Sequence, residues 1–169
     1  LYVEEHGYAE GRALAAQSRV FVATAAMCTQ HPEILGELKR HGVRVTAIVD
    51  EAAQLLEPQV IGILSQVDRA VLIGDERQLP AVVQQPAPMA AVTDPQLQSI
   101  GFHDLRMSLC ERLLLRCRER GWMQACGMLT DQGRMHRDIA SFSNHEFYGD
   151  KLQPLYPWQS SDDPLFRPD

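Results

Sequence analysis

The sequence predicts an α/β protein built on a parallel sheet. Three short apolar runs, at positions 19–24, 45–49 and 70–73, recur at intervals of about 25 residues and have the β-branched composition of buried strands. Helices are expected between them, at 32–40 and 58–67, because each of these segments begins with a proline. Such an alternation of strands and helices favours a parallel sheet, since parallel strands need a crossover connection.

The segment after the third apolar run is expected to leave the sheet. Residues 84–104 contain three prolines and little periodicity, which predicts a long surface excursion. A helix should follow, because Ser108 and Glu111 have the S-x-x-E spacing of a capping box and Gly121 supplies a stop. Four residues fall on one face of that helix: Cys110, Leu113, Leu114 and Cys117.

A second unit is expected to begin near Trp122, which divides the chain into residues 1–121 and 122–169. In the second unit, residues 128–130 are predicted to be extended and residues 138–147 helical, while the proline-rich end is a predicted loop. An apolar stripe at mostly helical spacing is more typical of a core than of a base-stacking surface. Its members are Ile139, Phe142, Phe147 and Tyr148.

The composition is that of a globular protein whose nucleic-acid contacts, if any, are local. The chain is 45% hydrophobic, and its net charge of −6 argues against a surface that coats nucleic acid, since such binding needs clustered Lys and Arg. No apolar run approaches the roughly 18–20 residues of a membrane span, and the first residues do not resemble a secretion signal. We therefore expect no membrane partner and a cytoplasmic location, or a nuclear one in a eukaryote. The four scattered cysteines indicate neither a disulfide framework nor a zinc site.

Two acids follow directly after the second apolar run. Asp50 and Glu51 lie where a predicted parallel strand ends, which is the edge at which such sheets bind ligands. In a nucleoside triphosphatase, an Asp at this edge holds magnesium and an adjacent Glu polarises the attacking water. Taken alone, the pair is more typical of two solvated acids at a strand end.

The third apolar run ends in a similar way. Gly74 provides a tight turn, Asp75 lies at the same edge, and Gln78 follows within reach of a ligand there. We expect Asp75 to face the same cofactor site and Gln78 to bond a γ-phosphate or the attacking water. As an isolated segment, this would be read as an ordinary surface turn.

Four segments together resemble successive motifs of superfamily 1 helicases: DEAAQ, GDERQLPAVV, SLCERL and QGRMHRDIASFSNHEFYGDKL. The similarity is to the branch, of superfamily 1B type, that contains the nonsense-mediated-decay RNA helicase and its DNA-acting relatives. It spans residues 19–153 in the family's order and spacing. The resemblance implies a partial RecA-like P-loop NTPase core and the start of a second RecA-like domain. It also implies ATP hydrolysis coupled to movement on single-stranded DNA or RNA.

The resemblance implies specific roles. Asp50 would bind Mg²⁺ beside ATP, Glu51 would be the catalytic base, and Gln78 would couple the γ-phosphate to the nucleic-acid path. Gln132 and Arg134 would belong to the second domain, Gln132 at the nucleotide and Arg134 reaching the γ-phosphate across the cleft. An Arg suits that position because its fixed charge stabilises the transferring phosphoryl group.

By the same similarity, Thr24, Leu79 and Pro80 would contact the nucleic-acid backbone. His136 is expected to have a structural role. The sequence departs from the family at Gly133, where an aromatic residue is usual, at Arg137, where Pro is usual, and at Ala81, where a second Pro is common. The first of these loosens the backbone beside Arg134.

The phosphate-binding loop G-x-x-x-x-G-K-[ST] has no counterpart in the chain. Only Lys39 and Lys151 are lysines, and neither has this context. We expect the chain to be an internal piece that works with the remainder of a helicase chain and is inactive alone. Two alternatives stay open at this point: a degenerate helicase domain that serves as a non-catalytic scaffold, and another P-loop motor that has lost unwinding.

Overall fold

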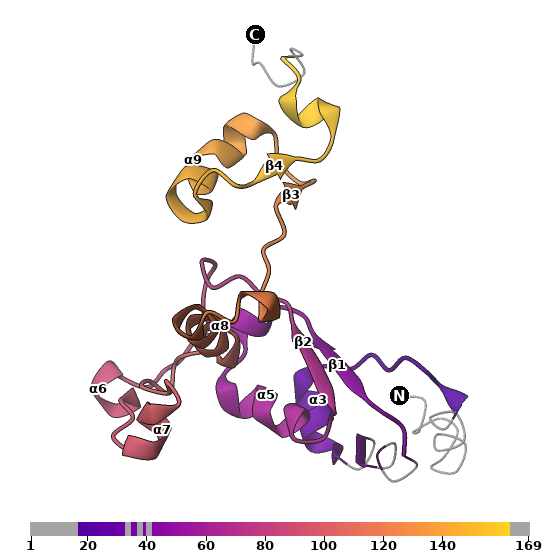
Figure 1. The fold of residues 1–169 in the computed structure, drawn as a ribbon, viewed down its shortest axis with the longest axis vertical. Coiled ribbons are helices and arrows are strands. Elements are labelled where there is room, and N and C mark those ends of the chain that lie inside the picture. Colours follow the sequence, from indigo (N-terminus) through magenta and orange to yellow (C-terminus); the bar gives the residue numbers. More distant parts are fainter. Residues whose placement is uncertain (1–16, 33–34, 37–38, 40–41, 163–169) are drawn as a thin grey trace. The chain divides into compact units, whose positions relative to one another are not determined.

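The computed structural model describes residues 17–32, 35–36, 39 and 42–162. The chain has two compact units, Leu1–Glu119 and Arg120–Asp169, and each is described by itself (Figure 1). Within the described residues, no helix is both long and apolar enough to cross a membrane.

The first unit holds a parallel pair of strands. Strand β1 (Thr46–Val49) pairs with β2 (Arg69–Leu72), and the register places Val49 opposite Leu72. The chain crosses from one to the other through the 3-10 turn η1 (Ala52–Gln54) and the helix α5 (Glu57–Leu64). The two strands confirm the parallel pairing expected from the sequence. Three of their four ends lie one residue from the expected positions, and the end of β1 at Val49 is as expected.

Helices cover the sheet. α3 (Ala25–Gln30) packs against α5, and Pro58 lies in the first turn of α5, as the proline signal predicts (Figure 1). In the predicted helix 32–40, the described residues Pro32, Leu35, Gly36 and Lys39 are helical, and the others lie outside the described residues.

The predicted strand at 19–24 is wrong. These residues have no regular structure, and the segment ends at Thr24, whose Oγ1 accepts a hydrogen bond from the Met27 N–H (3.2 Å) and caps α3. Val20 is 79% and Val22 95% exposed. A β-branched run becomes a strand only where a neighbour supplies ladder hydrogen bonds. Among the described residues of this unit, the sheet consists of β1 and β2, and residues 19–24 pair with neither.

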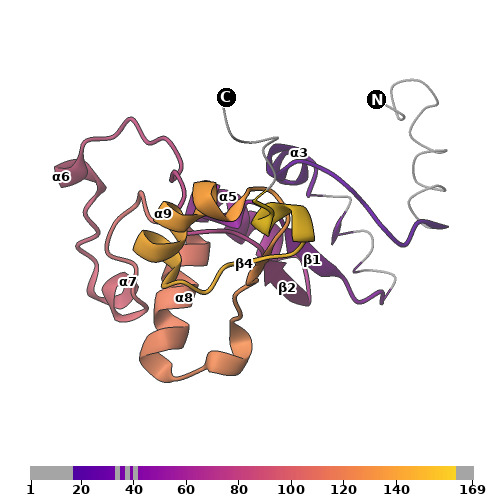
Figure 2. The same cartoon turned by 90° about the horizontal axis from the view of Figure 1, so that it is seen from above.

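The excursion at 84–104 has more structure than the sequence predicts. It forms α6 (Ala87–Ala90) and α7 (Pro95–Ser99), to one side of the sheet and away from α3 (Figures 1 and 2). Asp94 caps α7 by accepting from the backbone N–H groups of Gln96 and Leu97. Pro88 and Pro95 sit in first helical turns, where proline favours a helix rather than breaks it, and Pro86 is the N-cap residue of α6.

Helix α8 (Leu109–Arg120) follows the excursion. Its predicted start is confirmed, because Ser108 Oγ accepts from the Glu111 N–H at 3.1 Å. Its stop is confirmed at Gly121, whose φ is +69°. On the face expected from the sequence, Cys110, Leu114 and Cys117 are half-buried and Leu113 is exposed. The fully buried residues of the helix are Leu109 and Arg112. Arg112 can take the buried position because it has a charged partner, described below.

The second unit is small. β3 (Asp131–Gln132) pairs in parallel with β4 (Gln153–Pro154), and α9 (Arg137–Tyr148) connects them, which confirms the predicted helix at 138–147. The 3-10 turns η2 (Met123–Ala125) and η3 (Pro157–Ser160) flank this motif. Residues 128–130, which are expected to be extended, lie just before β3 and are not part of a strand.

Two expectations for this unit are wrong. The apolar stripe of α9 is not core in the described part of the chain, since Ile139, Phe142 and Phe147 are 66%, 70% and 49% exposed. Two strands of two residues each offer too little surface to cover it. The proline-rich end is also more than a loop, because it forms η3 and buries Gln159 completely.

Candidate nucleotide-binding site

The loop after β1 carries the first two candidate residues. Asp50 Oδ1 accepts a hydrogen bond from the Glu51 N–H at 3.0 Å, and Glu51 Oε2 accepts from Gln54 Nε2 at 3.2 Å. Glu51 has φ +51° and ψ +35°, a left-handed conformation that is uncommon for a residue with a side chain. Both carboxylates are exposed. The turn therefore presents two acids to solvent in a fixed local arrangement.

The loop after β2 carries Asp75 and Gln78. Asp75 Oδ2 accepts from Gln78 Nε2 at 2.9 Å, and Asp75 Oδ1 accepts from the Arg77 N–H at 3.0 Å. The Gln78 N–H also donates to the Asp75 carbonyl at 3.2 Å. The Asp75 carboxylate thus orients the amide of Gln78, an arrangement that the spacing of these residues did not predict.

Backbone contacts join the two loops. The Ile73 N–H donates to the Val49 carbonyl at 2.9 Å, and the Ala52 N–H donates to the Ile73 carbonyl at 2.8 Å. A Cβ on Gly74 would lie 2.7 Å from the backbone nitrogen of Ala53, so only glycine allows this approach. The acids after β1 and the Asp75–Gln78 pair therefore share one edge of the sheet, as predicted.

Helix α8 contacts the start of α5 and the loop after β2. Arg112 forms a buried ion pair with Glu57, at the start of α5, through Nε–Oε2 (2.8 Å) and Nη2–Oε1 (2.5 Å). Arg118 Nη2 lies 3.2 Å from Oε1 of Glu76, in the loop after β2. Sequence reasoning missed these contacts. The available signal was a charged residue, Arg112, on the apolar side of an amphipathic helix.

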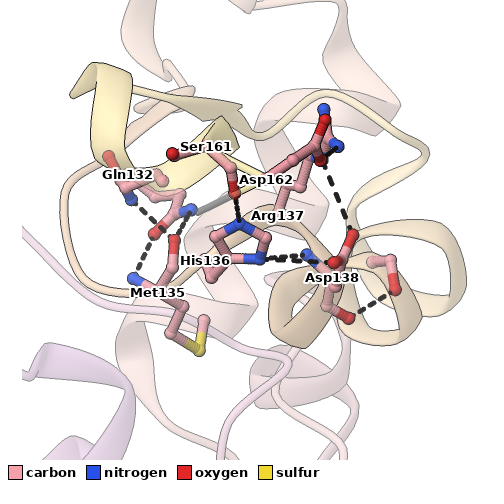
Figure 3. Close-up of polar contacts among 9 residues, drawn as sticks. Gln132, Met135, His136, Arg137, Asp138, Ser161 and Asp162 are labelled. Carbon is pink, nitrogen blue, oxygen red and sulfur yellow. Dashed lines mark hydrogen bonds and ion pairs between the residues drawn. The ribbon is translucent and has the colours of Figure 1, made fainter. Parts of the chain in front are cut away.

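In the second unit, the side chain of Gln132 is bonded into the loop that carries Arg134, and Figure 3 shows Gln132 beside Met135. Gln132 Oε1 accepts from the backbone N–H groups of Arg134 (3.1 Å) and Met135 (2.9 Å), and its Nε2 donates to the Met135 carbonyl (2.7 Å). The side chain of Arg134 is exposed. Because the two units are described separately, an approach of Arg134 to Glu51 stays a prediction.

His136 has the structural role that the sequence predicts. Its ring is buried, and Nδ1 caps α9 by accepting from the Asp138 N–H at 3.3 Å. Nε2 lies 3.0 Å from the Ser161 carbonyl, so the ring sits between Asp138 and Ser161 (Figure 3). With Nδ1 as acceptor, the proton belongs on Nε2, which then donates to Ser161.

The chain is similar to known helicases. A family model described as an AAA domain matches residues 8–86. The chain is 35% identical over 136 residues to the "DNA replication ATP-dependent helicase/nuclease DNA2" of Gallus gallus, covering 80% of this chain and 11% of that protein. It is 33% identical over 136 residues to the "DNA polymerase alpha-associated DNA helicase A" of Schizosaccharomyces pombe, covering 80% and 17%. The chain belongs to the superfamily 1 helicases.

A further relative of this helicase segment is the "3'-5' exoribonuclease HELZ2" of Mus musculus, 35% identical over 131 residues. That match covers 75% of this chain and 4% of the relative. The segment thus spans only a small share of the relatives that it matches. They fall in the branch of the nonsense-mediated-decay helicase that the motifs indicate.

The candidate nucleic-acid contacts of this helicase segment lie in the first unit. Leu79 is 84% exposed, and Pro80 lines an open pocket of about 390 Å³. The other lining residues are Ala81, Val83, Asp104, Arg106, Met107 and Glu111. Thr24 uses its hydroxyl as a helix cap. Contact of Thr24, Leu79 and Pro80 with nucleic acid stays a prediction.

Electrostatics are distinctive beside this pocket. Hydrogen bonds from the Arg106 side chain, and then from its backbone N–H, lower the pKa of Asp104 from 3.8 to about 2. The same side-chain bond raises the pKa of Arg106. Burial raises the pKa of the Cys110 thiol, and the carboxylates of Glu76 and Glu111 add to the effect. The hydrogen bonds from Arg106 therefore keep Asp104 ionised to lower pH than its ordinary pKa of 3.8 would allow.

The donor set at the edge of the sheet fits Mg²⁺. In phosphoryl-transfer sites this ion is bound by one or two carboxylates together with waters and phosphate oxygens. Asp50 offers an exposed carboxylate whose Oδ1 accepts from the Glu51 N–H. Its position at the end of a parallel strand is where such a carboxylate is needed.

Proposed function

We propose that the protein containing this chain is an ATP-driven motor that moves along single-stranded DNA or RNA. The observation that carries the proposal is the close packing of Gly74 against Ala53. A Cβ atom added to Gly74 would lie 2.7 Å from the backbone nitrogen of Ala53. This close approach sets the loop of Asp50 and Glu51 beside the loop of Gln78. A scaffold would keep this packing but has no physical need for the side chains of Asp50, Glu51 and Gln78 that the two loops carry.

The residues of the first unit would divide the work of hydrolysis. Asp50 would hold Mg²⁺, which neutralises charge on the phosphates when bound. Glu51 would orient the attacking water and accept its proton, since a carboxylate next to the reacting phosphate has the geometry of a general base. Gln78, held by Asp75 at 2.9 Å, would bond the γ-phosphate or that water and so report whether ATP is intact.

The second unit would supply the arginine. Arg134 is exposed, and its loop is fixed by Gln132 through three hydrogen bonds. A guanidinium delivered to the γ-phosphate in this way commonly accelerates phosphoryl transfer by about 10³-fold or more. Closure on ATP and opening after hydrolysis would then move the two units relative to a bound strand.

Phosphate binding needs a contribution from elsewhere. Neither Lys39 nor Lys151 lies in a G-x-x-x-x-G-K-[ST] loop, so residues 1–169 lack the lysine that holds the β- and γ-phosphates. We therefore propose that this chain on its own does not hydrolyse ATP. The activity belongs to the whole helicase chain, with Asp50, Glu51, Gln78 and Arg134 supplied by this part.

The test is an ATPase and strand-displacement assay on the full-length protein, with and without single-stranded DNA or RNA. We expect stimulated hydrolysis and directional displacement. Stimulated hydrolysis without displacement on any duplex would leave a motor that does not unwind. No hydrolysis under any condition would favour the scaffold and contradict the proposal.

A further inference from the structure

We infer that Gln132 and Gln159 are positioning residues that hold the loop of Arg134, rather than contacts for the nucleotide. The inference rests on the proposed function of Arg134. It replaces the nucleotide-binding role that resemblance implies for Gln132. It also gives a role to Gln159, a fully buried polar side chain that the mechanism does not otherwise use.

Gln132 directs its amide into its own loop. Oε1 accepts from the N–H groups of Arg134 and Met135, and Nε2 donates to the Met135 carbonyl at 2.7 Å. Both acceptor positions of Oε1 and one of the two Nε2 hydrogens are thus used by backbone groups two and three residues away, which leaves one N–H for any other partner. Its effect is to fix the backbone from which the Arg134 side chain leaves.

Gln159 donates a second hydrogen bond to the same carbonyl. Its Nε2 donates to the Met135 carbonyl at 2.7 Å, and its Oε1 accepts from the Tyr156 N–H at 2.8 Å. Its exposed fraction is 0%. The Met135 carbonyl therefore accepts from two amides, that of Gln132 within the loop and that of Gln159 in η3. The second bond links the loop of Arg134 to η3.

Three further contacts link residues 156–162, the tail of the described chain, to this loop and to the start of α9. A Cβ on Gly133 would lie 3.0 Å from Cε2 of Tyr156, so the Tyr156 ring occupies the space beside Gly133. His136 Nε2 lies 3.0 Å from the Ser161 carbonyl. Arg137 Nη2 donates to Asp162 Oδ1 at 2.7 Å, and Figure 3 shows this ion pair beside the capped start of α9. The tail offsets the freedom that a glycine would otherwise give the loop.

Positioning has kinetic consequences that direct contact does not share. An arginine finger acts only when its guanidinium meets the transition state, and a misplacement of about 1 Å can cost about 100-fold in rate. A positioning residue therefore affects turnover only while Arg134 is present. A nucleotide contact affects turnover, or nucleotide affinity, whether or not Arg134 is present.

The experiment is a double-mutant cycle in the full-length protein. The variants are Gln132→Glu, Gln159→Met and Arg134→Ala, together with each Gln variant combined with Arg134→Ala. Gln132→Glu keeps the acceptor for the Arg134 and Met135 N–H groups and loses the donor to the Met135 carbonyl. Gln159→Met keeps the volume of the buried side chain and loses both hydrogen bonds. Gln124→Ala, at an exposed glutamine of η2, is the matched control.

The readouts are kcat for ATP hydrolysis and the affinity for a fluorescent ADP analogue. We expect Arg134→Ala to lower kcat about 10³-fold, and each Gln variant to lower it about 10-fold to 100-fold. In the Arg134→Ala background, each Gln variant should change kcat by less than about 2-fold, because its effect passes through the missing residue. Affinity for ADP should be unchanged throughout, which also reports that every variant is folded.

Two results would overturn the inference while leaving the proposed function in place. One is a slow Arg134→Ala enzyme in which the Gln variants lower kcat by the same factor as in the wild-type background. The other is a Gln132→Glu enzyme with the wild-type kcat. Failure of the proposed function has a different signature, since the wild-type protein would then not hydrolyse ATP, or Arg134→Ala would keep the wild-type kcat.

Discussion

Arg112 and Glu57 form a two-point ion pair inside the first unit, with Nε–Oε2 at 2.8 Å and Nη2–Oε1 at 2.5 Å. Arg112 and Glu57 are 8% and 5% exposed. The remaining amino group of Arg112 donates to the Ile100 carbonyl at 2.9 Å, and the guanidinium lies 5.7 Å from the centre of the Phe102 ring. One side chain therefore joins α8, α5 and the excursion.

Removal of one partner of this pair should be costly. We expect Arg112→Ala to lower the free energy of unfolding of this unit by about 3–5 kcal/mol, because it leaves the Glu57 carboxylate buried without its partner. Amide hydrogen exchange of α5 and α8 in the full-length protein measures the change locally. Arg120→Ala, at an exposed arginine that ends the same helix, is the control. Equal protection in the two variants would contradict the prediction.

Replacement of both partners should be far milder. In Glu57→Leu/Arg112→Met no charge is left buried, and exchanges of this kind are often neutral or stabilising. We expect amide protection of α5 to recover most of what Arg112→Ala loses. A double variant as exposed to exchange as the single variant would show that the pair contributes more than the mutual neutralisation of two buried charges.

Gly74→Ala should separate the two loops of the site. The added methyl would meet the Ala53 nitrogen at 2.7 Å, and backbone cannot swing aside as a side chain can. We expect a loss of about 1–3 kcal/mol in stability, together with impaired ATP turnover. Gly62→Ala in α5 is the control, because a Cβ there meets nothing within 4 Å. That change should stabilise the helix by about 0.5–1 kcal/mol.

Asp104 should titrate at unusually low pH. Its pKa is lowered from 3.8 to about 2, first by the Arg106 side-chain bonds. The pairing is therefore fully present above pH 3.8 and is lost as the pH falls through about 2. In Arg106→Ala the pKa should return toward 3.8, whereas Arg120→Ala should leave it near 2. NMR titration of the side-chain carboxyl carbon measures this, and a wild-type value near 3.8 would refute it.

The parts of the fold that the sequence predicts are local. The runs that became β1 and β2, the proline-started α5, and the α8 boundaries at Ser108 and Gly121 each depend on a few adjacent residues. The acids after β1 follow from the same logic, since the end of a parallel strand fixes where they lie. The helicase motifs placed Gln78 and Arg134 in their loops but did not reveal what holds them.

The parts that the sequence did not predict are non-local. Residues 19–24 have strand composition, but a strand also needs a partner that composition does not supply. The Arg112–Glu57 pair links residues 55 apart, and Gln159 reaches Met135 across 24 residues. A single sequence does not show which distant polar groups meet. These contacts became visible only once the backbone had brought them together.

The central claim is that Glu51 is the catalytic base of an ATP-driven motor. Its most direct test is ATP turnover by the full-length protein carrying Glu51→Gln, with Glu146→Gln, an exposed site on α9, as the control. We predict that Glu51→Gln lowers kcat by about 10²–10⁴-fold, while ATP binding and the control variant keep wild-type behaviour. A Glu51→Gln enzyme that hydrolyses ATP at the wild-type rate would contradict the account.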